Sequence, residues 1–243
     1  MRKLVFGFMV AVALLAFPAV AGAKVGGGGT ILRHGPITKL RHSTSTNWAG
    51  YAATGGGFTT VTSTWTQPSA TCGSATTYSS FWVGLDGDGS STVEQTGTEA
   101  DCSGGHASYS AWYEMYPKYP VYLPSSFAVH PGNSFTATVT ASSRGRYTLT
   151  LKNNSTGQTF TTSQRGRGAN YSAEAIAEAP SSRSGVLPLT NFGTANFSNT
   201  RVNGLPIGNF RYDPITMASG STIKAQPSGL SGGTNFSVTW RHS

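Results

Sequence analysis

Hydrophobic and polar residues alternate along much of this chain with the period of two that is typical of β-strands. The clearest run contains Phe81, Val83 and Leu85, which are separated by polar or small residues. A strand here directs these apolar side chains to one face and directs Trp82 with Asp86 to the other. The first face is suited to a hydrophobic core and the second to contact with another molecule.

Turn-forming residues follow this predicted strand at positions 86–90, and residues 93–97 can return as a second strand. That pairing brings Gln95 to the face of Trp82. An ordinary hairpin with an exposed tryptophan has the same pattern, so the alternation alone leaves the function open.

Further alternating segments lie at positions 134–141, 147–151 and 236–240, and turn residues separate many of them. No convincing amphipathic helix appears, although Ala173 to Ala179 has helical propensity. About a dozen short strands at this spacing predict an all-β fold, an antiparallel two-sheet β-sandwich.

Two of the predicted strands carry acidic residues on one face. Trp112 and Glu114 share a face in the segment 107–116, and in the segment 172–178 Glu174 and Glu178 lie opposite a row of alanines. The whole chain has only nine acidic residues. Their concentration on a few strands therefore indicates a function for that face.

The N-terminus has the organisation of a secretory signal. Arg2 and Lys3 precede the apolar run from Leu4 to Val20, which small residues follow up to position 23. We therefore expect a signal peptide at 1–23, a basic linker or propeptide at 24–43 and the β-sandwich domain at 44–243. The protein is expected to be secreted, extracellular, without stable membrane association and monomeric.

The net charge of +8 arises mainly from the N-terminal region. From position 44 onward eleven of the 17 basic residues face all nine acidic residues, a small surplus that argues against a nucleic-acid partner. Four basic residues lie within 24–43, where no acid is present. We hypothesise that this basic arm covers an acidic groove and is released when acid neutralises the carboxylates.

The two cysteines, Cys72 and Cys102, favour one disulfide, because an even cysteine count in an exported chain is typical of a bridge. Two free buried thiols are the alternative. A metal site is not supported, because the histidines are scattered, and no cofactor is expected.

A groove with aromatic walls, a few acids and an amide is suited to an extended polymer, either a peptide or a polysaccharide. A partly buried glutamate can activate water, and a glutamine side chain can donate N–H to an oxyanion without titrating. Two carboxylates would instead indicate a glycosidase. A serine hydrolase is not favoured, because the histidines His106 and His130 have no evident acid–base partners in the sequence.

Five segments, in this order, resemble the glutamic peptidases, or eqolisins: Asn47 to Tyr51, Phe81 to Gly87, Gln95 to Gly97, Ala111 to Pro117 and Ala173 to Glu178. Five ordered motifs are more specific than any single one. The resemblance covers about residue 43 to the C-terminus. It implies a lectin-like sandwich whose concave face holds a catalytic glutamine and glutamate.

Matched motif by motif, Gln95 takes the place of the family's glutamine and Glu178 that of its glutamate. The positions that line the family's site correspond to Trp82, Asp86, Trp112 and Glu114. The resemblance therefore implies a peptidase that acts on proteins or peptides.

Two other function classes remain open on the residues alone. A carbohydrate-binding sandwich would use Trp82 and Trp112 as stacking platforms without catalysis. A jelly-roll glycosidase would use Glu114 and Glu178 as its pair of carboxylates.

Overall fold

The computed structural model describes residues 31–36 and 44–243. The predicted signal peptide lies outside the described residues, and so does the predicted linker apart from residues 31–36. Strands dominate the part of the chain that is described, and no helix within it is long and apolar enough to cross a membrane.

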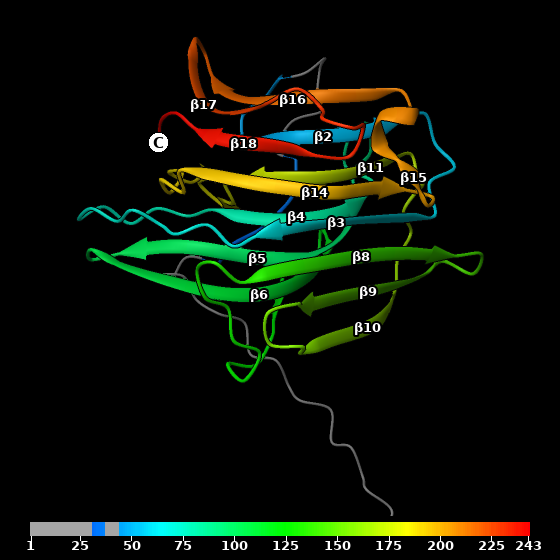
Figure 1. Ribbon diagram of the computed structural model, residues 1–243, viewed down its shortest axis with the longest axis horizontal. Coiled ribbons are helices and arrows are strands. Elements are labelled where there is room, and N and C mark those ends of the chain that lie inside the picture. The colour runs from blue at the N-terminus through cyan, green and yellow to red at the C-terminus, as the bar shows by residue number, and fades with distance from the viewer. Residues whose placement is uncertain (1–30, 37–43) are drawn as a thin grey trace, which may run out of the picture.

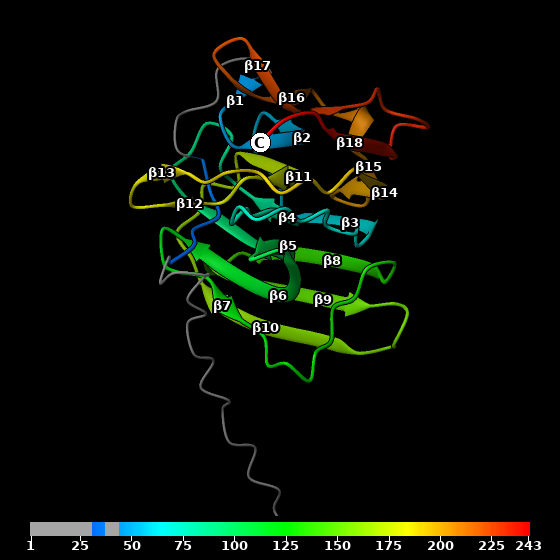
Figure 2. The same cartoon turned by 90° about the vertical axis from the view of Figure 1, so that its left-hand side faces the viewer.

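The strands form two large sheets that pack face to face (Figures 1 and 2). The first sheet has the spatial order β7 (Val121–Tyr122), β6 (His106–Tyr116), β5 (Val93–Ser103), β4 (Ser80–Leu85), β11 (Ser172–Glu178), β2 (Trp48–Thr54) and β16 (Tyr212–Ser219). All neighbouring strands in this sheet are antiparallel. This arrangement places β11 and β4 at its centre.

The second sheet covers one face of the first. Its spatial order is β10 (Thr159–Arg165), β9 (Arg146–Asn153), β8 (Ser134–Ser142), β3 (Thr60–Thr66), β14 (Thr194–Val202), β18 (Phe236–Trp240) and β17 (Thr222–Pro227). Five short elements complete the described chain: β1 (Thr44–Ser45), β12 (Ser181–Ser182), β13 (Gly185–Val186), β15 (Leu205–Pro206) and the 3₁₀ turn η1 (Ile207–Asn209). The predicted antiparallel two-sheet sandwich is confirmed.

Strand β16 belongs to both sheets. Its first half, from Tyr212 to Ile215, pairs with β2 of the first sheet, and its second half, from Met217 to Ser219, pairs with β17 of the second. The strand passes from one partner to the other between Ile215 and Met217, and the register of the ladder with β17 shifts just after this point, between Met217 and Ala218. Hydrogen bonds therefore run without a break from one sheet into the other.

The hydrophobic core lies between the sheets and takes one side chain in two from each strand. Phe81, Val83 and Leu85 of β4 are fully buried there, as the alternation predicted, together with Trp65 and Phe135 from the second sheet. Burial of each such side chain contributes roughly 1.5–3 kcal/mol to folding. The inner face of the first sheet therefore packs against the second sheet, and its outer face is available for a functional site.

Strand β11 forms despite its alanines, which favour helices in isolation. It is hydrogen-bonded on both edges, to β2 and to β4, and all of its residues are buried. Small side chains suit this central position, and a glycine on β5 makes room for the neighbouring strand β4. A Cβ atom on Gly97 would lie 2.1 Å from the carbonyl oxygen of Phe81 and 2.6 Å from the Cβ atom of Trp82. Gly97 thus allows β5 to lie close to β4 at Trp82.

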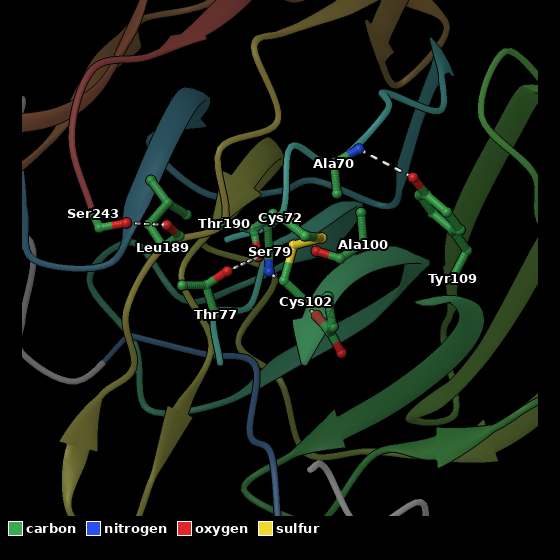
Figure 3. The surroundings of a disulfide bond; sticks show 11 residues. Ala70, Cys72, Thr77, Ser79, Ala100, Cys102, Tyr109, Leu189, Thr190 and Ser243 are labelled. Carbon is green, nitrogen blue, oxygen red and sulfur yellow. Dashed lines mark hydrogen bonds between the residues drawn. A yellow bond between two sulfur atoms is a disulfide. The ribbon is translucent and has the colours of Figure 1, made fainter. Parts of the chain in front are cut away.

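The predicted disulfide between Cys72 and Cys102 is present (Figure 3). It ties the segment before β4 to the end of β5. The same segment is held by the hydroxyl of Tyr109, which accepts a 3.0 Å hydrogen bond from the backbone N–H of Ala70. The bridge and this hydrogen bond both fix the entry into β4, the strand that carries Trp82.

Candidate active site

The outer face of the first sheet gathers the side chains that the sequence singled out. Gln95 on β5 lies opposite Glu114 on β6, and Glu178 on β11 lies opposite Trp48 on β2. Trp82, Trp112 and further apolar residues form a second buried cluster on this same face. Alternation along four paired strands therefore brings five of the six predicted site residues, Gln95, Glu178, Trp82, Trp112 and Glu114, to one surface.

Glu178 is completely buried and its carboxylate accepts three N–H groups. The indole nitrogen of Trp82 donates to Oε2 at 2.7 Å, and Asn47 Nδ2 donates to Oε1 at 3.0 Å. The third donor is the backbone N–H of Gly35, 2.9 Å from Oε1. Burial raises the pKa of Glu178 to about 8, and these hydrogen bonds oppose the rise.

Gln95 directs its amide nitrogen at the backbone of the N-terminal segment. Its Nε2 donates to the carbonyl oxygen of His34 at 2.5 Å, and the same nitrogen lies 3.4 Å from Oε2 of Glu114. A glutamine side chain holds this donor at any pH. Gln95 is therefore placed to stabilise negative charge that develops on a carbonyl oxygen.

Glu114 is the second fully buried carboxyl group of the site. It accepts the backbone N–H of His34 at 2.9 Å. Burial raises the pKa of Glu114 well above its usual range, and the charge of Glu178 raises it further.

Trp112 supplies an aromatic wall. The imidazole of His34 stacks on it with a centroid separation of 3.8 Å and an angle of 9° between the planes. Both rings are fully buried. In this arrangement Trp112 and Trp82 are enclosed side chains, whereas the sequence alone left open that they serve as exposed platforms.

Asp86 differs from its prediction. Strand β4 ends at Leu85, and Asp86 has a φ of 69°, so the alternation that put it beside Trp82 no longer applies. Its carboxylate accepts the backbone N–H groups of Asn170 and Tyr171, each at 2.8 Å. Asp86 therefore anchors the loop before β11, apart from the face that carries Gln95 and Glu178.

Asp86 has an acidic neighbour, Glu94, and a carboxyl oxygen of each lies beside Gly168. Burial, and then the charge of Asp86, raise the pKa of Glu94 to about 8.

Residues 31–36 occupy the site (Figure 2, blue segment). Arg33 pairs with Ser181 of β12 through two backbone hydrogen bonds of 2.8 and 2.9 Å, an antiparallel bridge. The chain then passes across the outer face, and Gly35 lies against the ring of Tyr116. The segment is therefore bound in part by main-chain pairing, as when a peptide adds a strand to the edge of a sheet.

Three residues of the site had no role assigned to them from the sequence. Asn47 holds Glu178, Ser80 Oγ lies 3.2 Å from His34 Nδ1, and Glu99 Oε2 lies 3.9 Å from His34 Nε2. The alternation itself contains the signal for Glu99, because residues 95, 97 and 99 of β5 point to the same face. Ser80 likewise precedes Trp82 by two positions on β4.

The two ends of one peptide bond meet the two candidate catalytic groups. The carbonyl oxygen of His34 faces the amide of Gln95, and the nitrogen of Gly35 faces the carboxylate of Glu178. A donor at the oxygen and a proton-transfer group at the nitrogen are the two functions that amide hydrolysis requires. The geometry thus suits peptide-bond chemistry, with the reacting bond supplied by the chain itself.

The sequence and the fold are similar to those of known peptidases. The model of the Peptidase A4 family matches residues 46–240. Aspergillopepsin-2 of Aspergillus niger is 36% identical over 122 residues, and that match spans 48% of this chain but only 43% of the relative.

Two solved structures are similar over nearly their whole length. Scytalido-glutamic peptidase, solved with a transition state analog inhibitor, has a TM-score of 0.71 and 28% identity, with 81% of this chain and 98% of that one covered. SCP-B, an eqolisin solved with the tripeptide Ala-Ile-His, has a TM-score of 0.67 and 27% identity, with the same coverage.

Proposed function

We propose, from the premise that this chain belongs to the Peptidase A4 family, that it is a secreted glutamic endopeptidase that works in acid. Gln95 and Glu178 are its catalytic pair, and proteins or peptides are its substrates. One observation carries the proposal: a single peptide bond lies between the amide of Gln95 and the carboxylate of Glu178.

The proposed reaction needs no covalent intermediate. Glu178, as carboxylate, takes a proton from a water molecule, and the resulting hydroxide attacks the carbonyl carbon. Gln95 Nε2 donates its N–H to the oxyanion, and Glu178 then gives the proton to the leaving nitrogen. Trp82 and Asn47 keep the carboxylate of Glu178 in place through both proton transfers.

The protonation state of Glu178 depends on what fills the site. Its pKa is about 8 with residues 31–36 in place, chiefly because burial excludes water. When water replaces this segment the carboxylate is less buried, which lowers its pKa. The hydrogen bond from Gly35 is lost, whereas those from Trp82 and Asn47, which also lower the pKa, remain. We therefore expect an ionised Glu178 in the open site at mildly acidic pH. An acidic medium in turn assists the protonation of a poor amine leaving group.

Action within a chain, rather than at its end, follows from the space on both sides of the bond. Before the bond, Arg33 pairs with β12. Beyond the bond, Gly35 contacts Tyr116, and Tyr116 also lines a cavity of about 590 Å³ that Arg144, Arg165 and Arg167 border. A substrate therefore has room to continue in both directions.

Secretion is proposed on two grounds. Residues 1–23 have the pattern of a signal peptide, and the disulfide between Cys72 and Cys102 is typical of an oxidising compartment. A peptide substrate is favoured over a polysaccharide because an eqolisin relative has been solved with a tripeptide.

The test is hydrolysis of a denatured protein from about pH 2 to about pH 7. Glu178→Gln is expected to abolish it, and Gln95→Ala to reduce kcat by about 10²–10³-fold. Glu174→Gln is the matched control, because Glu174 lies on the same strand and the same face but bonds to the backbone N–H of Asp88. This control should retain activity.

Full activity in folded Glu178→Gln or Gln95→Ala would exclude the proposed pair. Binding of polysaccharide without any peptide hydrolysis would favour the carbohydrate-binding alternative. Release of reducing sugar that depends on Glu114 would favour the glycosidase.

A further inference from the structure

The peptide bond between His34 and Gly35 is the part of this chain that lies in the proposed catalytic pair. We propose that this bond is a self-cleavage site, which the chain's own Gln95 and Glu178 hydrolyse. The inference rests on the proposed function and adds to it a defined internal substrate, with histidine before the cleaved bond and glycine after it.

The backbone on both sides of the bond is fixed. Before it, Arg33 exchanges two hydrogen bonds with Ser181, and the N–H of His34 donates to Glu114. After it, the carbonyl oxygen of Gly35 accepts from Asn47 Nδ2 at 2.8 Å. The bond therefore cannot slide by one residue without loss of these contacts.

The side chain before the bond fills a closed pocket. His34 is fully buried, with Trp112 stacked on its ring, Ser80 Oγ near Nδ1 and a carboxylate oxygen of Glu99 near Nε2. A flat ring with two nitrogen atoms matches this aromatic wall and these two polar groups. We assign the pocket formed by Trp112, Ser80 and Glu99 as the one that recognises the residue before the cleaved bond.

The residue after the bond has almost no room. A Cβ atom on Gly35 would lie 2.8 Å from Cδ2 of Tyr116. The ring would have to move to accept any other residue. Glycine at this position is therefore part of the recognition.

The chemical step consumes one water molecule. The water oxygen bonds to the carbonyl carbon of His34 and one water proton passes to Glu178. The bond from that carbon to the nitrogen of Gly35 then breaks, and Glu178 returns the proton to the nitrogen. The products are a peptide that ends in the carboxyl group of His34 and a chain that begins with the amino group of Gly35.

The experiment uses the full chain, purified at neutral pH and then held at several pH values between about 4 and about 7, because His34 stays in the site only while its imidazole is neutral. Intact-mass and N-terminal analysis should find a new N-terminus at Gly35. The first-order rate should be the same at every protein concentration, because the cleaved bond already lies in its own molecule's site. Glu178→Gln should stay intact.

Two substitutions in the segment separate recognition from folding, because residues 31–36 belong to neither sheet. Gly35→Val should slow the cut at this bond about tenfold or more. Ile31→Ala changes a residue that is 41% exposed and should cut at the wild-type rate.

A new N-terminus elsewhere, in a chain that hydrolyses added protein, overturns the self-cleavage site and leaves the proposed function intact. The same holds if Gly35→Val is cut at this bond as fast as wild type. A cut at Gly35 that persists in Glu178→Gln also overturns it, because another protease then makes the cut. If neither the chain nor added protein is hydrolysed by folded wild type, the proposed function itself fails.

Discussion

The indole nitrogen of Trp82 donates a 2.7 Å hydrogen bond to Oε2 of Glu178, across the neighbouring strands β4 and β11. This bond stabilises the ionised carboxylate and so lowers the pKa of Glu178. We expect Trp82→Phe to move the acidic limb of the kcat profile toward higher pH by about one unit, the size expected when a hydrogen bond to a charged group is lost. The measurement is kcat against pH on a peptide substrate.

Trp65→Phe is the control for this prediction. It also removes an indole N–H, but that group donates to Thr98 in the core between the sheets. The acidic limb of the kcat profile of Trp65→Phe should lie at the same pH as that of wild type. An unchanged limb in Trp82→Phe would show that the hydrogen bond does not set the titration of Glu178.

Acid should release residues 31–36 from the site. Burial lowers the pKa of His34 to about 3, against 6.5 for an exposed histidine. The site binds only the neutral imidazole. The contribution of His34 to the binding of residues 31–36 is therefore complete above pH 6.5 and is lost as the pH falls toward 3. The groups that face the ring are Trp112, Ser80, Glu99 and Glu178. Each pH unit below 6.5 should weaken binding about tenfold.

Tryptophan fluorescence of the Glu178→Gln chain can follow this release, because His34 stacks on Trp112 and this chain cannot cut itself. The substitution also removes the titration of Glu178, whose raised pKa would weaken binding as the pH rises through about 8. His34→Asn in the same background should lose the pH dependence. A release curve that His34→Asn leaves unchanged would assign the effect to another group.

The buried carboxyl groups should make the fold more stable in acid. Burial raises the pKa values of Glu94, Glu114 and Glu174. The folded state therefore keeps protons that the unfolded chain releases, and the free energy of unfolding falls as the pH rises from about 4.5 toward about 8. Urea unfolding at several pH values measures this slope.

Glu94→Gln should reduce that slope, because the amide cannot ionise. Asp213→Asn removes an acid on strand β16, away from the pair formed by Glu94 and Asp86, and should keep the wild-type slope. A wild-type protein that is more stable at about pH 8 than at about pH 5 would contradict the prediction.

Asp86→Asn should affect stability more than catalysis. The carboxylate accepts two backbone N–H groups with two different oxygens, and an asparagine offers only one oxygen. We expect a loss of about 1–3 kcal/mol in the free energy of unfolding and a kcat of the folded enzyme within about fivefold of wild type. A large rise in KM with unchanged stability would show that Asp86 lines the substrate groove, as the family resemblance implies.

Alternation along the chain predicted which side chains share a face, because a strand has only two faces. Gln95, Trp112, Glu114 and Glu178 are on one surface for that reason alone. The rule failed at Asp86, where a left-handed φ of 69° turns the chain before the next residue. A period of two carries no information about such a turn.

The position of residues 31–36 was beyond local patterns. His34 meets Gln95 across 61 residues, and Gly35 meets Glu178 across 143. The basic composition of this region suggested that it covers an acidic groove. Charge alone, however, does not determine which residue of the segment lies at which position of the groove. Which peptide bond faces the catalytic pair follows only from the backbone pairing with β12 and from the fit of one imidazole.

Strand β16 pairs with a strand of each sheet, so the part of the chain that the structure describes has no hinge between its two layers. An enzyme with two separate domains can admit a long substrate by a hinge movement that opens the cleft between the domains. Here such a movement between the two sheets would break a continuous hydrogen-bonded ladder, and the site lies on the outer face of the first sheet, away from that interface. Entry of a peptide into the site therefore depends on the segment that lies across the outer face, and not on a movement of the two sheets against each other.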